Sequence, residues 1–138
     1  VQAYPIEFWF VGPRQVWTPE ELKNDRRIRW FGAVPRNNVA EYYRQADIFI
    51  LPTFSDGFGL TQLEAQCWKL PVVASAYCGR VVRHGENGLL LEDISASTIA
   101  DTLQRLVTSP GELRMMAAVS GIVEPFSLSS LAASLTSL

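Results

Sequence analysis

Short apolar runs typical of β-strands alternate with segments of helical periodicity along most of this chain. Strand patterns cover residues 6–12, 28–34, 47–52, 71–75 and 87–92. Helical patterns cover residues 18–22, 36–46, 59–70, 95–109, 110–121 and 127–138. Strands that alternate with helices predict a parallel sheet, and "DIFILP" at 47–52 is apolar enough for a strand covered on both faces. We therefore expect an α/β fold, a Rossmann-like parallel sheet with helices on both faces.

Two local patterns give further expectations about the helices. Thr18 can cap the first helix, with Pro19 at its first position and Glu21 at the third, as in a capping box. In the helix expected at 59–70, Leu60, Leu63 and Cys67 share one stripe. We expect this stripe to face the core, which would make Cys67 a buried thiol.

Composition excludes several classes of protein. A chain of 138 residues with 48% hydrophobic and 19% charged residues is globular and long enough to bury a core. A net charge of −2 argues against nucleic acid as a partner. No apolar run approaches the roughly 20 residues of a transmembrane segment, although peripheral membrane contact of a parent protein stays open. The two cysteines match neither a disulfide scaffold nor a zinc site, which favours a reducing, cytoplasmic location.

The stretch "SDGFGLTQLEA" at 55–65 places glycines and acids between a strand and a helix. Ligands of parallel sheets bind at the carboxyl ends of the strands, and the free N–H groups of a helix start suit phosphate. Asp56 precedes the expected helix start at Gly59, and Glu64 follows about one turn later. A carboxylate can accept two hydroxyl hydrogen bonds. The pattern of acid, phosphate cradle and acid would therefore suit a molecule built of sugar, diphosphate and ribose.

A plainer interpretation of the same residues exists. Asp56 could be a turn or capping residue, and Glu64 an acid favoured by the helix dipole. Glycine-rich turns between strand and helix are common, so the residues alone leave the two interpretations balanced.

Several motifs in order resemble those of one family. "FVGP" at 10–13 resembles a strand ending in Val-Gly-x-Gly-Pro. Residues 28–75 resemble the run from a Phe-x-Gly strand through a Glu-x7-Glu signature, and "HGENGLLLE" at 84–92 resembles a His-Gly-x-Asn-Gly-Leu-Leu segment. Over about residues 5–125 the chain is similar to the carboxyl-terminal, donor-binding domain of GT-B fold glycosyltransferases of the retaining family 4, also called group 1.

The resemblance implies roles for the matching positions. Glu64 matches a glutamate that binds the ribose hydroxyls of a nucleoside diphosphate sugar donor, and Asp56 matches a glutamate that contacts the donor hexose at the reacting face. The other positions implied to meet the donor are Gly57, Phe58, Gly59, Leu60 and Thr61 around hexose and diphosphate, Val34, Pro35 and Arg36 at the nucleobase, and Gly12 and Pro13 on the cleft wall. Family members use no bound metal, so we expect no metal and no other cofactor.

The sequence departs from the family at three places. Asp56 stands where glutamate is usual and reaches roughly 1.3–1.5 Å less far. Cys78-Gly79-Arg80 replaces a stretch that often begins Gly-Gly; a solvated surface is the plainer place for Arg80, but it follows a strand-end glycine and is our best candidate for charge at the phosphates. The family's preceding strand, at the middle of its sheet, and its acceptor-binding domain would lie outside this sequence. We therefore expect this chain alone to be inactive.

The resemblance favours transfer of a hexose from a nucleoside diphosphate sugar to an acceptor, with the anomeric configuration retained. A non-catalytic nucleotide-binding module is the alternative, with Asp56 marking drift from catalysis. A nucleotide-sugar epimerase of the same fold is a weaker alternative, because the spacing of Asp56 and Glu64 argues against it. The donor's base and sugar, the acceptor and the oligomeric state do not follow from the sequence.

Overall fold

The computed structural model describes residues 4–14, 18–121, 126, 127, 129, 130 and 133. The chain divides into two compact units, residues 1–45 and 46–138. The first unit contains a two-stranded sheet and the second a three-stranded sheet, and all strand pairs are parallel. The expected α/β fold with parallel strands is confirmed.

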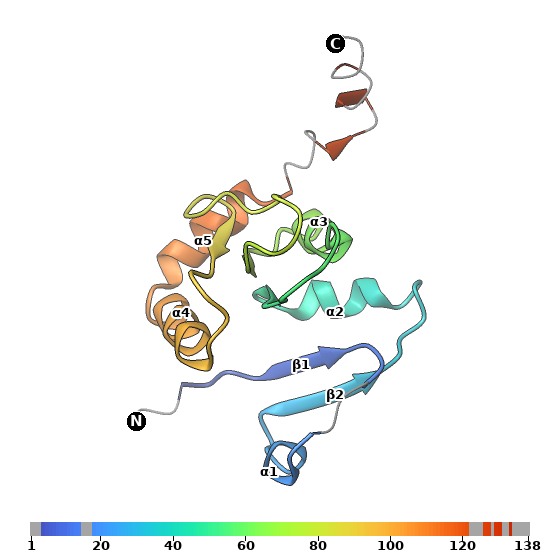
Figure 1. The fold of residues 1–138 in the computed structure, drawn as a ribbon, viewed down its shortest axis with the longest axis vertical. Coiled ribbons are helices and arrows are strands. Elements are labelled where there is room, and N and C mark those ends of the chain that lie inside the picture. Colours follow the sequence, from blue (N-terminus) through green and yellow to red (C-terminus); the bar gives the residue numbers. More distant parts are fainter. Residues whose placement is uncertain (1–3, 15–17, 122–125, 128, 131–132, 134–138) are drawn as a thin grey trace. The chain divides into compact units, whose positions relative to one another are not determined.

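The described residues of the first unit form two strands and two short helices. They are β1 (Phe8–Val11), α1 (Glu20–Lys23), β2 (Ile28–Gly32) and α2 (Val39–Gln45). Figure 1 shows β1 and β2 side by side, and their register pairs Phe8 with Ile28 and Phe10 with Trp30. The two parallel strands run in the same direction, so the segments that follow β1 and β2 lie at the same end of the sheet.

Aromatic rings pack against one another in the first unit. The ring of Phe31 on β2 contacts those of Trp9 on β1 and Tyr42 on α2 edge to face, at centroid distances of 5.3 and 4.8 Å. Phe10 and Trp30 stack at 4.3 Å, and both are more than a third exposed. Edge-to-face and offset-stacked pairs add to the free energy gained by burying their area. These rings explain why two short strands and one helix stay together.

In the second unit, the strands and helices of residues 46–121 follow one another along the chain. They are β3 (Phe49–Leu51), α3 (Leu60–Cys67), β4 (Val72–Ala74), β5 (Gly88–Leu90), α4 (Ala96–Thr108) and α5 (Pro110–Val119). The strand order is β3-β4-β5, with β4 in the centre. In Figure 1, α4 and α5 are the two orange helices and α3 is the green one.

The hydrophobic core of this unit lies on both faces of β4, whose three residues are all 0% exposed. Val73 packs in a cluster with Leu89, Leu106 of α4 and Met116 of α5. Neighbouring residues of a strand point to opposite faces, so Val72 and Ala74 face away from that cluster. Helix α3 contacts β3 and β4 and contributes no residue to the cluster. Helices therefore cover both faces of this sheet, as the apolar strand patterns predict.

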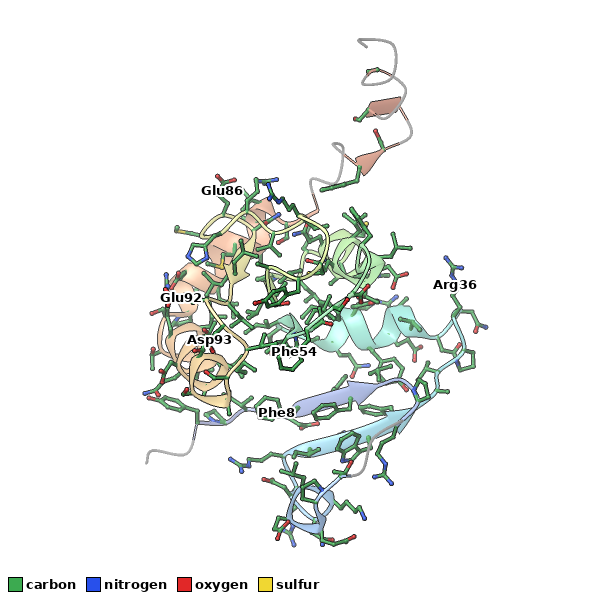
Figure 2. The ribbon with its side chains drawn as sticks, viewed as in Figure 1. Phe8, Arg36, Phe54, Glu86, Glu92 and Asp93 are labelled. Atoms are coloured by element: carbon green, nitrogen blue, oxygen red, sulfur yellow. The ribbon has the colours of Figure 1, made fainter. Side chains whose placement is uncertain are left out.

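Helix α4 has a side-chain N-terminal cap. The Ser95 hydroxyl accepts a hydrogen bond from the Thr98 N–H at 3.2 Å, which satisfies one of the free donors of the helix start. The Asp93 carboxylate accepts bonds from the Ser95 N–H at 2.7 Å and from the Thr98 hydroxyl at 3.0 Å. Hydrogen bonds from Ser95 and Thr98 hold the pKa of Asp93 below its usual range. Glu92 and Asp93 lie on the segment between β5 and α4 (Figure 2).

Three expectations about the helices are wrong or lie outside the described residues. The N-cap of α1 is Pro19, with no side-chain cap, so Thr18 does not cap it and is instead 4% exposed. The buried residues of α3 are Gln62, Ala65 and Gln66, whereas Cys67 is exposed. The helix expected at 127–138 falls largely outside the residues that the structure describes.

Candidate functional site

The loop after β3 carries the first group of predicted site residues. Asp56, Gly57 and Phe58 are exposed, and buried Gly59 is the N-cap of α3, with φ +69° and ψ +58°. This left-handed conformation strains residues that have a Cβ. A Cβ on Gly59 would also lie 2.9 Å from Gln62 Nε2 and 3.1 Å from Leu51 Cδ2. Both conformation and space therefore require glycine at this position.

The start of α3 is open toward solvent. No side chain of the described residues caps it, so its first peptide N–H groups have no side-chain acceptor there. Leu60 and Thr61 are exposed on the first turn, and Glu64 is exposed one turn further on. The helix start thus presents backbone donors and a carboxylate, the two features expected for binding phosphate and sugar hydroxyls.

Gly57 differs from Gly59 in its backbone conformation and in the space around its Cα atom. Its φ is not in the left-handed region, and a Cβ would meet nothing within 4 Å. The conformational freedom of glycine is therefore used at Gly59 and not at Gly57. Neither the backbone conformation nor the packing of the described residues therefore requires glycine at position 57.

The loop after β4 is bonded to the loop after β3. The Asp56 N–H donates to the Tyr77 carbonyl at 3.1 Å, and the Gly79 N–H donates to the Phe58 carbonyl at 2.9 Å. The Ser75 hydroxyl donates to the Thr53 carbonyl at 2.6 Å. The carboxyl ends of adjacent parallel strands meet at one edge, and these bonds join the two loops there.

Two buried glutamines lie on the face of α3 that packs inward. Gln62 Nε2 donates to the Phe58 carbonyl at 3.1 Å and to the Gly79 carbonyl at 3.2 Å, and it lies 3.3 Å from Cys78 Sγ. Gln66 is also 0% exposed, and neither of its amide atoms has a hydrogen-bond partner among the described residues. Our sequence prediction missed Gln62, because glutamine in a helix usually lies at the surface. The available signal was its position beside Ala65, opposite the Leu60 stripe.

The Cys78-Gly79-Arg80 segment places three different groups beside the turn. Burial, and then the negative charge of Asp56, raise the pKa of the Cys78 thiol. Gly79 allows close approach, since a Cβ there would lie 2.6 Å from the Phe58 carbonyl oxygen. Arg80 is exposed and makes no ion pair within the described part of the chain. Its guanidinium is therefore available to an anionic ligand.

The remaining predicted site residues belong to the first unit. Gly12 and Pro13 follow β1, and Val34, Pro35 and Arg36 follow β2, so all five lie at the carboxyl ends of the two parallel strands. The Gly12 N–H donates to the Gly32 carbonyl at 2.8 Å, which holds these ends together. Arg36 is exposed and extends away from its loop (Figure 2). Each unit thus gathers its own predicted residues at one sheet end, and their joining in a single cleft stays a prediction.

A concave region lies between β5 and α4. It is a pocket of about 320 Å³ lined by His84, Leu89, Leu90, Glu92, Thr98, Asp101, Thr102 and Arg105. The Leu90 N–H donates to His84 Nδ1 at 3.0 Å, and Arg105 pairs with Glu112. None of the predicted site residues lines this pocket, and its ionic side chains are of both signs. We place the candidate site at the loops after β3 and β4 for that reason.

Metal-binding groups and membrane-spanning helices are both absent from the described residues. In those residues, no three His, Cys, Asp or Glu side chains are grouped so that they could hold a metal ion. None of the described helices is both long and apolar enough to cross a bilayer.

Comparisons with known proteins give one family. A model of the family "Glycosyl transferases group 1" matches residues 1–109. The chain is 36% identical over 122 residues to a D-inositol 3-phosphate glycosyltransferase of Corynebacterium glutamicum, covering 86% of this chain and 29% of that protein. A protein of the same description from Kribbella flavida is 38% identical over 94 residues, covering 67% of this chain and 22% of that protein. The chain thus spans less than a third of the length of these relatives.

Solved structures show the same fold. The C-terminal domain of a glycosyl transferase group 1 family protein (LpcC) from Francisella tularensis matches with a TM-score of 0.68 and 28% identity, covering 80% of this chain and 59% of that one. Anabaena Alr3699/HepE, solved in complex with UDP, matches with a TM-score of 0.77 and 20% identity, covering 99% of this chain and 43% of that one. At 20% identity the second likeness concerns the fold alone.

Proposed function

This chain belongs to the group 1 glycosyl transferases, and we propose that residues 1–138 form the nucleotide-sugar-binding, carboxyl-terminal domain of a retaining glycosyltransferase. The parent enzyme transfers a hexose from a nucleoside diphosphate sugar to an acceptor. The chain spans 29% of the length of its Corynebacterium relative. In this proposal the acceptor is bound outside residues 1–138, and we expect no transfer by this chain alone.

The open N-terminus of α3 is the observation that carries this proposal. Its free peptide N–H groups, around Gly59, Leu60 and Thr61, bind the donor diphosphate, helped by the positive end of the helix dipole. Exposed Arg80, on the loop bonded to the same turn, adds positive charge. When the glycosidic bond to the diphosphate breaks, negative charge grows on the leaving group, and these donors stabilise it.

The two acids act at opposite ends of the donor. Glu64, on the second turn of α3, accepts hydrogen bonds from the ribose hydroxyls. Asp56, on the exposed loop before the helix, meets the hexose at the reacting carbon. The space that Gly57 leaves open lies next to Asp56 in the chain, where the hexose would enter. The family resemblance assigns Val34, Pro35 and Arg36 to the nucleobase and Gly12 and Pro13 to the wall of the donor cleft; all five belong to the first unit.

Calorimetric titration of this chain with UDP-, GDP- and ADP-sugars tests the proposal. We expect one nucleotide class to bind and Glu64→Ala to weaken that binding by about tenfold or more, because hydrogen bonds to a charged group are lost. Asp101→Ala is the control, since it removes an exposed acid from the middle of α4. Equal affinity of Glu64→Ala and the unchanged chain would contradict the ribose assignment. Absence of binding to every donor would contradict the donor site itself.

A further inference from the structure

The buried amide of Gln62 connects the two loops of the candidate site. Its Nε2 atom lies 3.1 Å from the carbonyl oxygen of Phe58, on the loop after β3, and 3.2 Å from that of Gly79, on the loop after β4. The residue is 0% exposed. An amide nitrogen has two hydrogens, so it can serve one carbonyl on each loop at the same time.

The packing around this amide leaves little freedom. The Phe58 carbonyl accepts a second hydrogen bond, from the Gly79 N–H at 2.9 Å. A Cβ on Gly59 would lie 2.9 Å from Gln62 Nε2, and one on Gly79 would lie 2.6 Å from the Phe58 oxygen. The turn, the second loop and the Gln62 amide nitrogen are therefore in close contact, and the absence of both Cβ atoms allows that contact.

We infer that Gln62 is a positioning residue for the donor, which it does not itself touch. This inference rests on the proposed function. Two internal donors hold the Phe58 carbonyl inside the protein, so its partial negative charge is kept away from the diphosphate. The same bonds hold the loop of Arg80 against the turn. Without Gln62, the peptide between Phe58 and Gly59 gains freedom to rotate, since glycine permits many backbone conformations. If that peptide rotates, the Phe58 carbonyl would face the ligand in place of the Gly59 N–H.

Gln66 provides a matched control for Gln62. It lies on the same buried face of α3 and is also 0% exposed, yet its amide has no hydrogen-bond partner among the described residues. Methionine has nearly the volume of glutamine and no hydrogen-bond donor, so Gln62→Met and Gln66→Met change chemistry with little change of shape. If Gln62→Met does not fold, Gln62→Asn keeps the amide but is too short to reach both carbonyls.

Two measurements on the 138-residue chain test the inference. Hydrogen exchange of the Gly79 amide should be about tenfold faster in Gln62→Met, because a buried hydrogen bond that restrains its acceptor is lost. Gln62→Met should bind the nucleotide sugar that the unchanged chain binds about tenfold more weakly, as measured by titration. Gln66→Met should match the unchanged chain in both measurements.

The possible outcomes separate this inference from the proposed function. Unchanged exchange at Gly79 in folded Gln62→Met would show that the amide does not join the loops. Faster exchange with unchanged donor affinity, while Glu64→Ala loses binding, would overturn the positioning role but keep the proposed function. If the unchanged chain binds no donor, the proposed function and the donor role of Gln62 both fail, even where exchange at Gly79 rises.

Discussion

At the scale of the residue, Gly57 and Gly59 have different reasons to be glycine. Gly59 has a left-handed backbone and no room for a Cβ, whereas Gly57 has neither restriction. We expect Gly59→Ala to lower the free energy of unfolding by about 1–3 kcal/mol through strain and overpacking. Gly57→Ala should leave it within about 0.5 kcal/mol, as exposed substitutions usually do. Urea unfolding of the two variants measures both values.

The same pair also separates stability from ligand binding. If the donor hexose passes close to Gly57, Gly57→Ala should weaken binding of the nucleotide sugar while leaving unfolding unchanged. Unchanged binding in that variant would place the hexose elsewhere on the loop. Loss of stability in Gly57→Ala would show instead that the open space beside it is used by the fold.

Residue types predicted the loop well and the buried face of α3 poorly. The run from Asp56 to Glu64 does form a loop followed by a helix start, because glycines and an apolar strand indicate that change locally. Which face of α3 is buried depends on the neighbours that the helix packs against. In this packing Gln62 is buried and Cys67 is exposed. The hydrogen-bond acceptors of Gln62 come from residues 58 and 79. A partner so distant in sequence cannot be found from helical periodicity.

At the scale of the element, the cap of α4 couples the stability of the second unit to pH. Ser95→Ala should lower the free energy of unfolding by about 1 kcal/mol, since the Thr98 N–H loses its acceptor. The folded pKa of Asp93 is lowered, so its contribution is present above the unfolded value of about 3.9 and is lost as pH falls through the folded value. Asp93→Asn should therefore reduce the loss of stability that the chain shows on acidification.

Urea unfolding between neutral pH and about pH 3 measures this effect. Asp101→Asn serves as the control, because its side chain projects from the middle of α4 and not from the cap. Equal acid sensitivity of Asp93→Asn and the unchanged chain would show that the cap does not contribute to the pH dependence.

Strand and helix types were predictable for the described elements, and several boundaries were not. The three pairs of parallel strands follow from the alternation of strand and helix patterns. Helix α3 ends at Cys67 and not at residue 70, because Lys69 has φ +61° and the Leu70 N–H turns back to the Ala65 carbonyl. Lysine is common inside helices, so the residue type at position 69 does not indicate that the helix ends there. In α1, Pro19 starts the helix one position later than the capping pattern suggests.

At the scale of the whole molecule, the two units differ in how much core they contain. The second unit includes Val73, Leu106 and Met116, each at most 1% exposed. In the described part of the first unit only Thr18 is classed as buried. Two paired strands with short helices are marginally stable by themselves. We therefore expect residues 46–138 to fold alone and residues 1–45 not to.

Circular dichroism and urea unfolding of the two fragments measure this difference. Residues 46–138 should retain one cooperative transition, and residues 1–45 should show none. A cooperative transition in the short fragment would mean that the aromatic contacts of Trp9, Phe31 and Tyr42 are sufficient as a core. Its absence in the long fragment would show that the first unit is required for the second to fold.

The exposure of Cys67 has a practical consequence for optical work on this domain. It is the last residue of the helix whose first turn forms the candidate site, and its side chain is exposed. The raised pKa of Cys78 lowers the fraction of reactive thiolate there at neutral pH. A maleimide dye therefore attaches first to Cys67, without any engineered cysteine. The protein thus carries its own labelling position, from which fluorescence can follow changes in α3 as ligands are added.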